Sequence, residues 1–181
     1  MILEPLLTVY VMELGADQDE ASLQSGIIFS AVGIATLIAA PQWGKIGSRI
    51  GFVKVLVIGL LGGGIGNILQ FFVGHYAGFG ALRFVYGLFF AGVYPALNAL
   101  IVKVTEPEFR GRAFSLNQSA TQLATMLGPI VGGALGGWIP IRWVFVLNGA
   151  LLIGSALLLL GNRSAVSSDR VRQAEGRRAE M

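Results

Sequence analysis

Apolar residues in this chain occur in long runs that no charged residue interrupts. Asp, Glu, Lys and Arg are absent from the stretches Ala21–Gly44, Val55–Leu82, Phe84–Val102, Ala113–Ile141 and Trp143–Asn162. Each stretch has about 19 residues or more, and at a rise of about 1.5 Å per residue a helix of that length crosses a hydrocarbon layer of about 30 Å. The pattern therefore predicts a chain that crosses a lipid bilayer several times.

Together with a shorter apolar segment around Pro5, these runs predict six helices. We expect them at about residues 2–14, 23–43, 53–74, 79–102, 113–136 and 142–161. Connections of roughly 5 to 12 residues would make sequence neighbours antiparallel. Residues 1–161 then form an all-α polytopic membrane helix bundle, because lipid requires backbone polar groups to be satisfied within helices. Residues 162–181 turn to Ser, Arg, Glu and Ala, which predicts a disordered basic tail.

The first predicted helix is short for a membrane span. Ile2–Leu14 provides about 20 Å of helix, and Glu4 and Glu13 interrupt its apolar run. It lacks the basic leader and small-residue cleavage site of a signal peptide. We therefore expect that the chain starts inside a longer helix and belongs to a larger protein.

Composition agrees with a lipid environment and argues against several kinds of chemistry. Hydrophobic residues make up 54% of the chain and charged residues 13%, whereas an average soluble domain has about 25% charged residues. There is no cysteine and a single histidine, His75, so we expect neither a metal site nor a cofactor. No nucleophile is paired with a histidine base or a carboxylate, which leaves an integral-membrane enzyme as a distant alternative.

The basic residues predict the orientation of the bundle. All but two of the 13 lie in the connection after 23–43, in the connection after 79–102, or in the tail. They are Lys45, Arg49 and Lys54, then Lys103, Arg110 and Arg112, then Arg163, Arg170, Arg172, Arg177 and Arg178. The positive-inside rule places these segments and both termini in the cytoplasm, with the bundle in the cell membrane. We interpret the net charge of +3 as topology and contact with anionic lipid rather than nucleic-acid binding.

Polar and small residues share one face of the helix expected at 113–136. The face fits either a close packing seam or the wall of a water-filled path. Pro129 lacks a backbone donor and predicts a bend. The face contains Asn117, Gln118, Thr121, Gln122 and Thr125, followed by Gly128, Gly132 and Gly136.

Glycines are also frequent in the helix expected at 53–74, where we interpret them as tight packing surfaces. The alternative is a dinucleotide-binding turn. It does not fit, because the last glycine position of G-x-G-x-x-G, counted from Gly62, holds Asn67, and no acidic residue follows about 20 residues later. The glycines are Gly59, Gly62, Gly63, Gly64, Gly66 and Gly74.

Two ionisable residues fall within the predicted spans. A charge in hydrocarbon costs roughly 2.5 to 3.5 kcal/mol, so Arg83 either faces the bundle interior or extends to the interface. Glu4 lies about 15 Å along a helix from the outer end at Gly15. Near the bilayer midplane, desolvation would favour the protonated carboxyl and let it exchange a proton when water arrives. In the alternative, Glu4 lies near the cytoplasmic surface and is merely solvated.

The segment Gly44–Leu56 resembles the loop motif of the major facilitator superfamily, roughly G-x-L-a-D-r-x-G-r-r-x-x-l. Gly44, Arg49, Gly51 and Leu56 match it, but Ser48 occupies the acidic position, which argues against a charge-based gate there.

Three further segments resemble the same family. Arg83–Gly87 is similar to its helix-4 motif, with an arginine four residues before a glycine. Gly128–Gly133 is similar to its antiporter motif and includes Pro129, Gly132 and Gly133. Pro107–Arg112, with Arg110 and Arg112, resembles a connection found in bacterial drug exporters.

The resemblance implies a fold of two six-helix halves around a central path, with substrate between the halves. This chain resembles one half. The degraded loop motif and the basic tail favour the carboxyl-terminal half, although the glycine-proline motif is better known from the other. The resemblance also implies that the helices expected at 2–14 and 79–102 line the path, and that those at 23–43 and 113–136 face the missing half. The path residues so implied are Glu4, Thr8, Arg83, Tyr94 and Asn98, beside the polar Asn117, Gln118 and Gln122.

The resulting functional hypothesis is half of a secondary transporter that exports small, lipophilic solutes in exchange for protons by alternating access. Its expected partners are the bilayer, a missing amino-terminal half or a second copy of the chain, a small-molecule substrate and the proton, with no nucleic acid. The alternative is a membrane fragment or scaffold subunit that transports nothing by itself.

Overall fold

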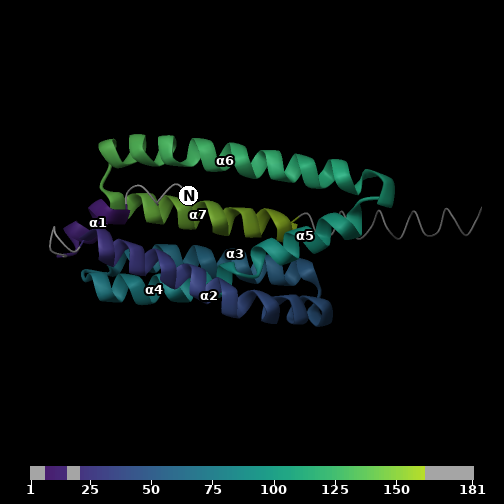
Figure 1. Ribbon diagram of the computed structural model, residues 1–181, viewed down its shortest axis with the longest axis horizontal. Coiled ribbons are helices and arrows are strands. Elements are labelled where there is room, and N and C mark those ends of the chain that lie inside the picture. The colour runs from purple at the N-terminus through teal and green to yellow at the C-terminus, as the bar shows by residue number, and fades with distance from the viewer. Residues whose placement is uncertain (1–6, 16–20, 162–181) are drawn as a thin grey trace, which may run out of the picture.

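The computed structural model describes residues 7–15 and 21–161. The predictions for Glu4, for the start of the first helix and for the tail at 162–181 lie outside these ranges. The described residues form helices and no strand (Figure 1), and four helical passes are long and apolar enough to cross a membrane: Ser22–Ile50, Phe52–Phe72, Tyr76–Val104 and Ile141–Gly161. The prediction of an all-α, polytopic membrane helix bundle is confirmed.

The helices follow each other along the chain with short connections. They are α1 (Leu7–Glu13), α2 (Ala21–Ile50), α3 (Phe52–Leu69) with the 3₁₀ turn η1 (Gln70–Phe72), α4 (Tyr76–Phe90), α5 (Val93–Val104), the 3₁₀ turn η2 (Pro107–Phe109), α6 (Arg110–Trp138) and α7 (Ile141–Gly161).

The connection between α2 and α3 differs from the prediction. A loop was expected after residue 43, but α2 continues to Ile50 and only Gly51 separates it from α3. Gly51 has φ +96°, a conformation that glycine adopts without steric cost, so one residue reverses the chain. Lys45 and Arg49 therefore lie in α2 and Lys54 in α3. The expectation of longer connections is wrong here because the uncharged runs mark the hydrocarbon width, whereas the helices extend beyond it.

The helix expected at 79–102 is two helices, α4 and α5, separated at Ala91 and Gly92. Pro95 explains the break. Proline has no backbone N–H and its ring clashes with the carbonyl four residues earlier, which is that of Ala91. The ring of Trp43 packs against Gly92, and its Nε1 donates a hydrogen bond of 2.7 Å to the carbonyl oxygen of Leu88. These two contacts of Trp43 fix the chain against α2 at the break between α4 and α5.

Glycines allow α3 to sit at the centre of the bundle, against α7, α4 and α5. A Cβ added at any of its glycines would touch a neighbouring helix, and at Gly64 it would lie 2.6 Å from Ile153 Cγ1. The interpretation of these glycines as packing surfaces is confirmed for Gly59, Gly62, Gly63, Gly64 and Gly66. Gly74 follows η1 and faces open space.

An aromatic cluster closes the end of the bundle where α1 lies. Tyr10 of α1, Phe79 of α4 and Phe145 of α7 are almost fully buried, with ring centroids 5.1 to 5.4 Å apart. Edge-to-face and tilted contacts of this kind add to the stabilisation from apolar burial. The cluster ties the short α1 to two long helices.

The helix α6 has few contacts with the others and runs along one side of the bundle (Figure 1). Its buried residues are Gly128 and Gly132, while Gly133 faces open space. The helix remains continuous through Pro129. Much of the apolar surface of α6 is exposed in the described part of the chain, including Leu116, Met126 and Ile130.

Candidate functional site

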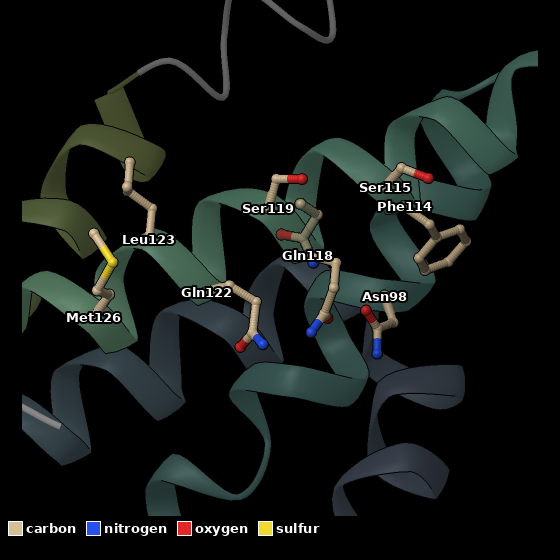
Figure 2. Close-up of a pocket in the computed structure, with 9 residues that line it drawn as sticks. Asn98, Phe114, Ser115, Gln118, Ser119, Gln122, Leu123 and Met126 are labelled. Atoms are coloured by element: carbon tan, nitrogen blue, oxygen red, sulfur yellow. The ribbon is translucent and has the colours of Figure 1, made fainter.

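A wide-open surface cleft of about 890 Å³ lies where α5 faces α6, and we name it the amide cleft. Its lining residues are Asn98, Phe114, Ser115, Asn117, Gln118, Ser119, Gln122, Leu123 and Met126. Figure 2 shows Asn98 on one wall and Gln118 and Gln122 on the other. The break at Ala91 and Gly92 matters for this geometry, because it separates α5, which carries Asn98, from α4.

The four carboxamides of the amide cleft are available to a ligand. Across residues 7–15 and 21–161, the structure contains no hydrogen bond from the side chains of Asn98, Asn117, Gln118 or Gln122 to protein. The hydroxyl of Thr121, on the same helix, instead donates to the carbonyl oxygen of Asn117 at 2.8 Å. Amides supply both donors and acceptors, so the cleft can bind either kind of group.

The nearest basic side chains on α6 have partners within the protein. Arg110 Nε donates to the carbonyl oxygen of Thr105 at 3.4 Å, and the guanidinium of Arg112 lies 5.8 Å from the ring centre of Phe109. None of the residues that line the amide cleft is charged. The lining of the cleft is therefore uncharged, and it combines amides and hydroxyls with apolar side chains.

A second cavity of about 600 Å³, the central cavity, lies among α1, α2, α4, α5, α6 and α7. It combines one cation with hydroxyl, amide and aromatic groups. Its lining residues are Leu7, Ile28, Phe29, Ser30, Val32, Gly33, Thr36, Arg83, Tyr86, Phe90, Tyr94, Thr121, Ala124, Thr125, Asn148 and Leu152.

Arg83 points into the bundle. Its guanidinium carbon lies 5.3 Å from the ring centre of Phe79 and 5.4 Å from that of Phe145, and both rings are buried. Aromatic faces attract cations, which offsets part of the cost of removing the charge from water. Arg83 therefore faces the bundle interior and does not extend to the membrane interface. Tyr86 and Tyr94 line the same cavity as Arg83.

The path residues predicted from the sequence are divided between the two cavities. Arg83 and Tyr94 line the central cavity, whereas Asn98, Asn117, Gln118 and Gln122 line the amide cleft. Thr8 is half-buried on α1 and lines neither cavity. Glu4 lies outside the described residues.

Most lining residues of the central cavity were not predicted. Two of them, Tyr86 and Asn148, had a sequence signal. Tyr86 belongs to the Arg83–Gly87 motif, and Asn148 is an isolated amide in the apolar run Trp143–Asn162. Polar residues within a membrane-spanning run usually face a cavity or another helix.

The other motif residues have structural positions. Gly44 and Arg49 lie in α2, and Gly51 forms the turn to α3. Ser48, at the acidic position of the loop motif, donates its hydroxyl to the carbonyl oxygen of Lys45 at 2.7 Å. In the part of the chain that the structure describes, no group of three or more His, Asp or Glu residues could hold a metal ion.

Apolar helices around polar cavities define the class of multi-pass helical membrane proteins. The Major Facilitator Superfamily matches residues 1–180, and the chain belongs to this family. This match confirms the family that the sequence motifs predicted. Its members are membrane transporters rather than enzymes.

Several curated proteins are similar to most of the chain. Multidrug resistance protein MdtG of Salmonella typhimurium is 34% identical over 153 residues, which is 84% of this chain and 38% of that protein. The protein of the same name from Proteus mirabilis is 37% identical over 149 residues, covering 82% and 37%, and that from Erwinia billingiae is 35% identical over 153 residues, covering 84% and 37%. The chain thus spans less than two fifths of the length of these relatives.

Proposed function

We propose that the chain forms one half of a secondary transporter that exports small solutes in exchange for protons by alternating access. The observation that carries this proposal is that polar side chains gather at two cavities among otherwise apolar helices. A path for solutes needs such groups, because polar side chains are costly in lipid unless they face a cavity or a partner. The relatives are named as multidrug resistance proteins, which supports export of varied solutes.

A partner half is part of the proposal. The helix α6 buries only Gly128 and Gly132 among its residues, so most of its surface is available to further helices or lipid. The chain spans 38% of the length of the Salmonella relative, which leaves room for a second set of helices there. In facilitator-type transporters, one repeat rocks against the other around the substrate site. A second copy of the chain is the other candidate partner.

Orientation and location complete the proposal, with the protein in the cell membrane and both termini in the cytoplasm. Six basic residues lie at one end of the bundle. They are Lys45 and Arg49 near the end of α2, Lys54 near the start of α3, Lys103 near the end of α5, and Arg110 and Arg112 at the start of α6. Membrane proteins keep their basic ends in the cytoplasm.

Transport is tested with the chain in liposomes, alone and together with a polypeptide that supplies the proposed amino-terminal half. Solute flux driven by a pH gradient is expected when both polypeptides are present, or from the chain alone if two copies assemble. Absence of flux in both preparations, from protein that is inserted and folded, would favour the alternative of a scaffold subunit.

Proton coupling is tested at Glu4, in the protein that sustains flux. Glu4→Gln is expected to abolish gradient-driven flux, because the amide cannot exchange a proton, while insertion stays normal. Glu13→Gln is the matched control, since Glu13 is exposed at the end of α1. Unchanged flux in the Glu4 variant would remove Glu4 from the coupling mechanism.

A further inference from the structure

A side chain of another helix bonds to the backbone next to the break between α4 and α5. Trp43 Nε1, on α2, donates to the carbonyl oxygen of Leu88, 45 residues further along the chain, at 2.7 Å. We propose that this hydrogen bond is a latch that holds the pass bent, and that the pass straightens when the N–H of Gly92 replaces the indole as donor. The inference goes beyond the proposed transport function, because it concerns two states of one helical pass.

The carbonyl of Leu88 has two possible donors. In a continuous α-helix it would accept from the N–H four residues later, which is that of Gly92. In the structure, the N–H of Gly92 donates instead to the carbonyl oxygen of Phe89, at 3.3 Å. A backbone carbonyl without a donor is costly in lipid, and the indole of Trp43 supplies one. The bent and straight forms therefore both satisfy Leu88, each with a different donor.

Close packing brings the indole to this carbonyl. Gly92 is buried, and a Cβ added there would lie 2.9 Å from Cγ of Trp43 and 3.1 Å from Cγ1 of Val55. Only the absence of a side chain at Gly92 leaves room for the ring. On the α3 side, a Cβ at Gly59 would lie 2.9 Å from Cγ2 of Val93. The break is thus enclosed between α2 and α3, and the latch acts from the α2 side.

Pro95 and the latch favour the same form by different means. The proline ring opposes a straight helix by its clash with the carbonyl of Ala91, whereas the latch lowers the free energy of the bent form by satisfying Leu88. Removal of the latch leaves Leu88 without its donor in the bent form only. The straight form then gains population, because there the N–H of Gly92 is available to Leu88.

The latch would control both cavities at once. The helix α5 carries Tyr94, which lines the central cavity, and Asn98, which lines the amide cleft. A change in the direction of α5 relative to α4 moves both side chains. The bond between Trp43 and Leu88 is therefore placed to couple the position of α2 to the shape of both cavities.

The bond itself is tested through the indole N–H. The chain has three tryptophans, so labelling with ¹⁵N-tryptophan in lipid nanodiscs gives three indole signals, and loss of one in Trp43→Phe assigns that of Trp43. This N–H is expected to exchange with deuterium oxide at least about tenfold more slowly than that of Trp138, because hydrogen bonding protects against exchange. The side chain of Trp138 is 90% exposed. Equal exchange rates would overturn the latch.

The straightening is tested with Trp43→Phe, which keeps an aromatic ring beside Gly92 but has no N–H. Spin labels at Val85→Cys on α4 and Val102→Cys on α5, both exposed positions, report the angle between the two helices. The distance distribution is expected to gain a longer component, near the separation of about 25 Å in a straight helix. Trp138→Phe, which removes an indole of α6, is the matched control and should leave the distribution unchanged.

A second variant displaces the indole without changing Trp43. Gly92→Ala places a Cβ against the ring, so it should speed exchange of the Trp43 N–H and add the same longer component, even if Trp43→Phe fails to fold. The latch would be overturned if the folded variants kept the original distribution, or if they only broadened it around the original distance. None of these measurements uses solute flux, so failure of the latch and failure of the transport proposal are distinguishable.

Discussion

Two glycines set the closest approach between α3 and α7. A Cβ added at Gly149 would lie 2.7 Å from the carbonyl oxygen of Gly64 and 2.8 Å from Ile68 Cγ1. Because one of these atoms belongs to the backbone, the clash cannot be relieved by a side-chain rotation alone. Small residues at such crossings let helices pack in lipid, where apolar burial does not drive association.

Gly149→Ala is therefore expected to destabilise the bundle. Overpacking of this kind costs about 1 to 3 kcal/mol, so the midpoint of thermal unfolding in detergent, followed by circular dichroism, should fall. Gly154→Ala is the matched control on α7, because a Cβ there would have nothing within 4 Å and alanine favours helix. Equal midpoints for the two variants would contradict the close approach.

Single residues were only partly predictable. The sequence indicated that the glycines of α3 pack tightly, but not that Gly64 meets Gly149, since that pairing depends on how far α7 is shifted along α3. Asn67 on α3 and Gln70 in the 3₁₀ turn η1 give a second example, because both are fully buried. Their amide nitrogens donate to the carbonyl oxygens of Gly63 and Gly66 at 3.2 Å. Their polarity alone would have suggested a path.

At the scale of elements, the break between α4 and α5 sets the direction of α5, which contributes side chains to both cavities. Tyr94 lines the central cavity, and Asn98, one turn further along α5, lines the amide cleft. Pro95 lies between them. A straight helix from Tyr76 to Val104 would position α5 differently relative to α6.

Pro95→Ala is expected to straighten this pass, because alanine can donate its N–H to the carbonyl of Ala91. The chain has no cysteine, so spin labels can be placed directly at Val85→Cys and Val102→Cys, both exposed positions. A straight helix separates these positions by about 25 Å. Pulsed electron paramagnetic resonance should show a longer and narrower distance distribution in the alanine variant.

Pro129→Ala in α6 serves as the comparison, since α6 is already continuous and carries neither label. It should leave the distribution unchanged. If the Pro95 variant also left it unchanged, the contact of Trp43 with Gly92, rather than the proline, would be responsible for the break.

Helix existence was predictable from the uncharged runs, but helix ends were not. The positive φ of Gly51 sets the end of α2 and the start of α3. Other glycines of this segment could have adopted the same backbone conformation, so the sequence did not identify Gly51 as the turn. The charged residues Lys45 and Arg49 were misleading, because a helix can extend past the hydrocarbon layer with charges at its end.

For the molecule as a whole, the asymmetry of charge predicts a fixed orientation. Ser48→Cys, at the end rich in basic residues, should react with a membrane-impermeant maleimide only after spheroplasts are permeabilised. Pro140→Cys, between α6 and α7, should react in intact spheroplasts, because that connection lies at the opposite end. Both positions are exposed, and the reverse pattern of labelling would overturn the orientation.

The sequence predicted some of the residues that line the two cavities, but not how they divide between them. The sequence selected the amides and Arg83 because polar residues stand out in apolar helices. It combined them in one path, whereas the structure distributes them between two cavities. That division depends on how α6 stands relative to α4 and α5, which no local pattern encodes.

The single-residue turn at Gly51 also bears on how the chain is made. Because a single residue joins α2 to α3, we expect the two helices to enter the bilayer together as a hairpin during synthesis. A reporter domain inserted at Gly51 would separate them and is expected to disturb that step.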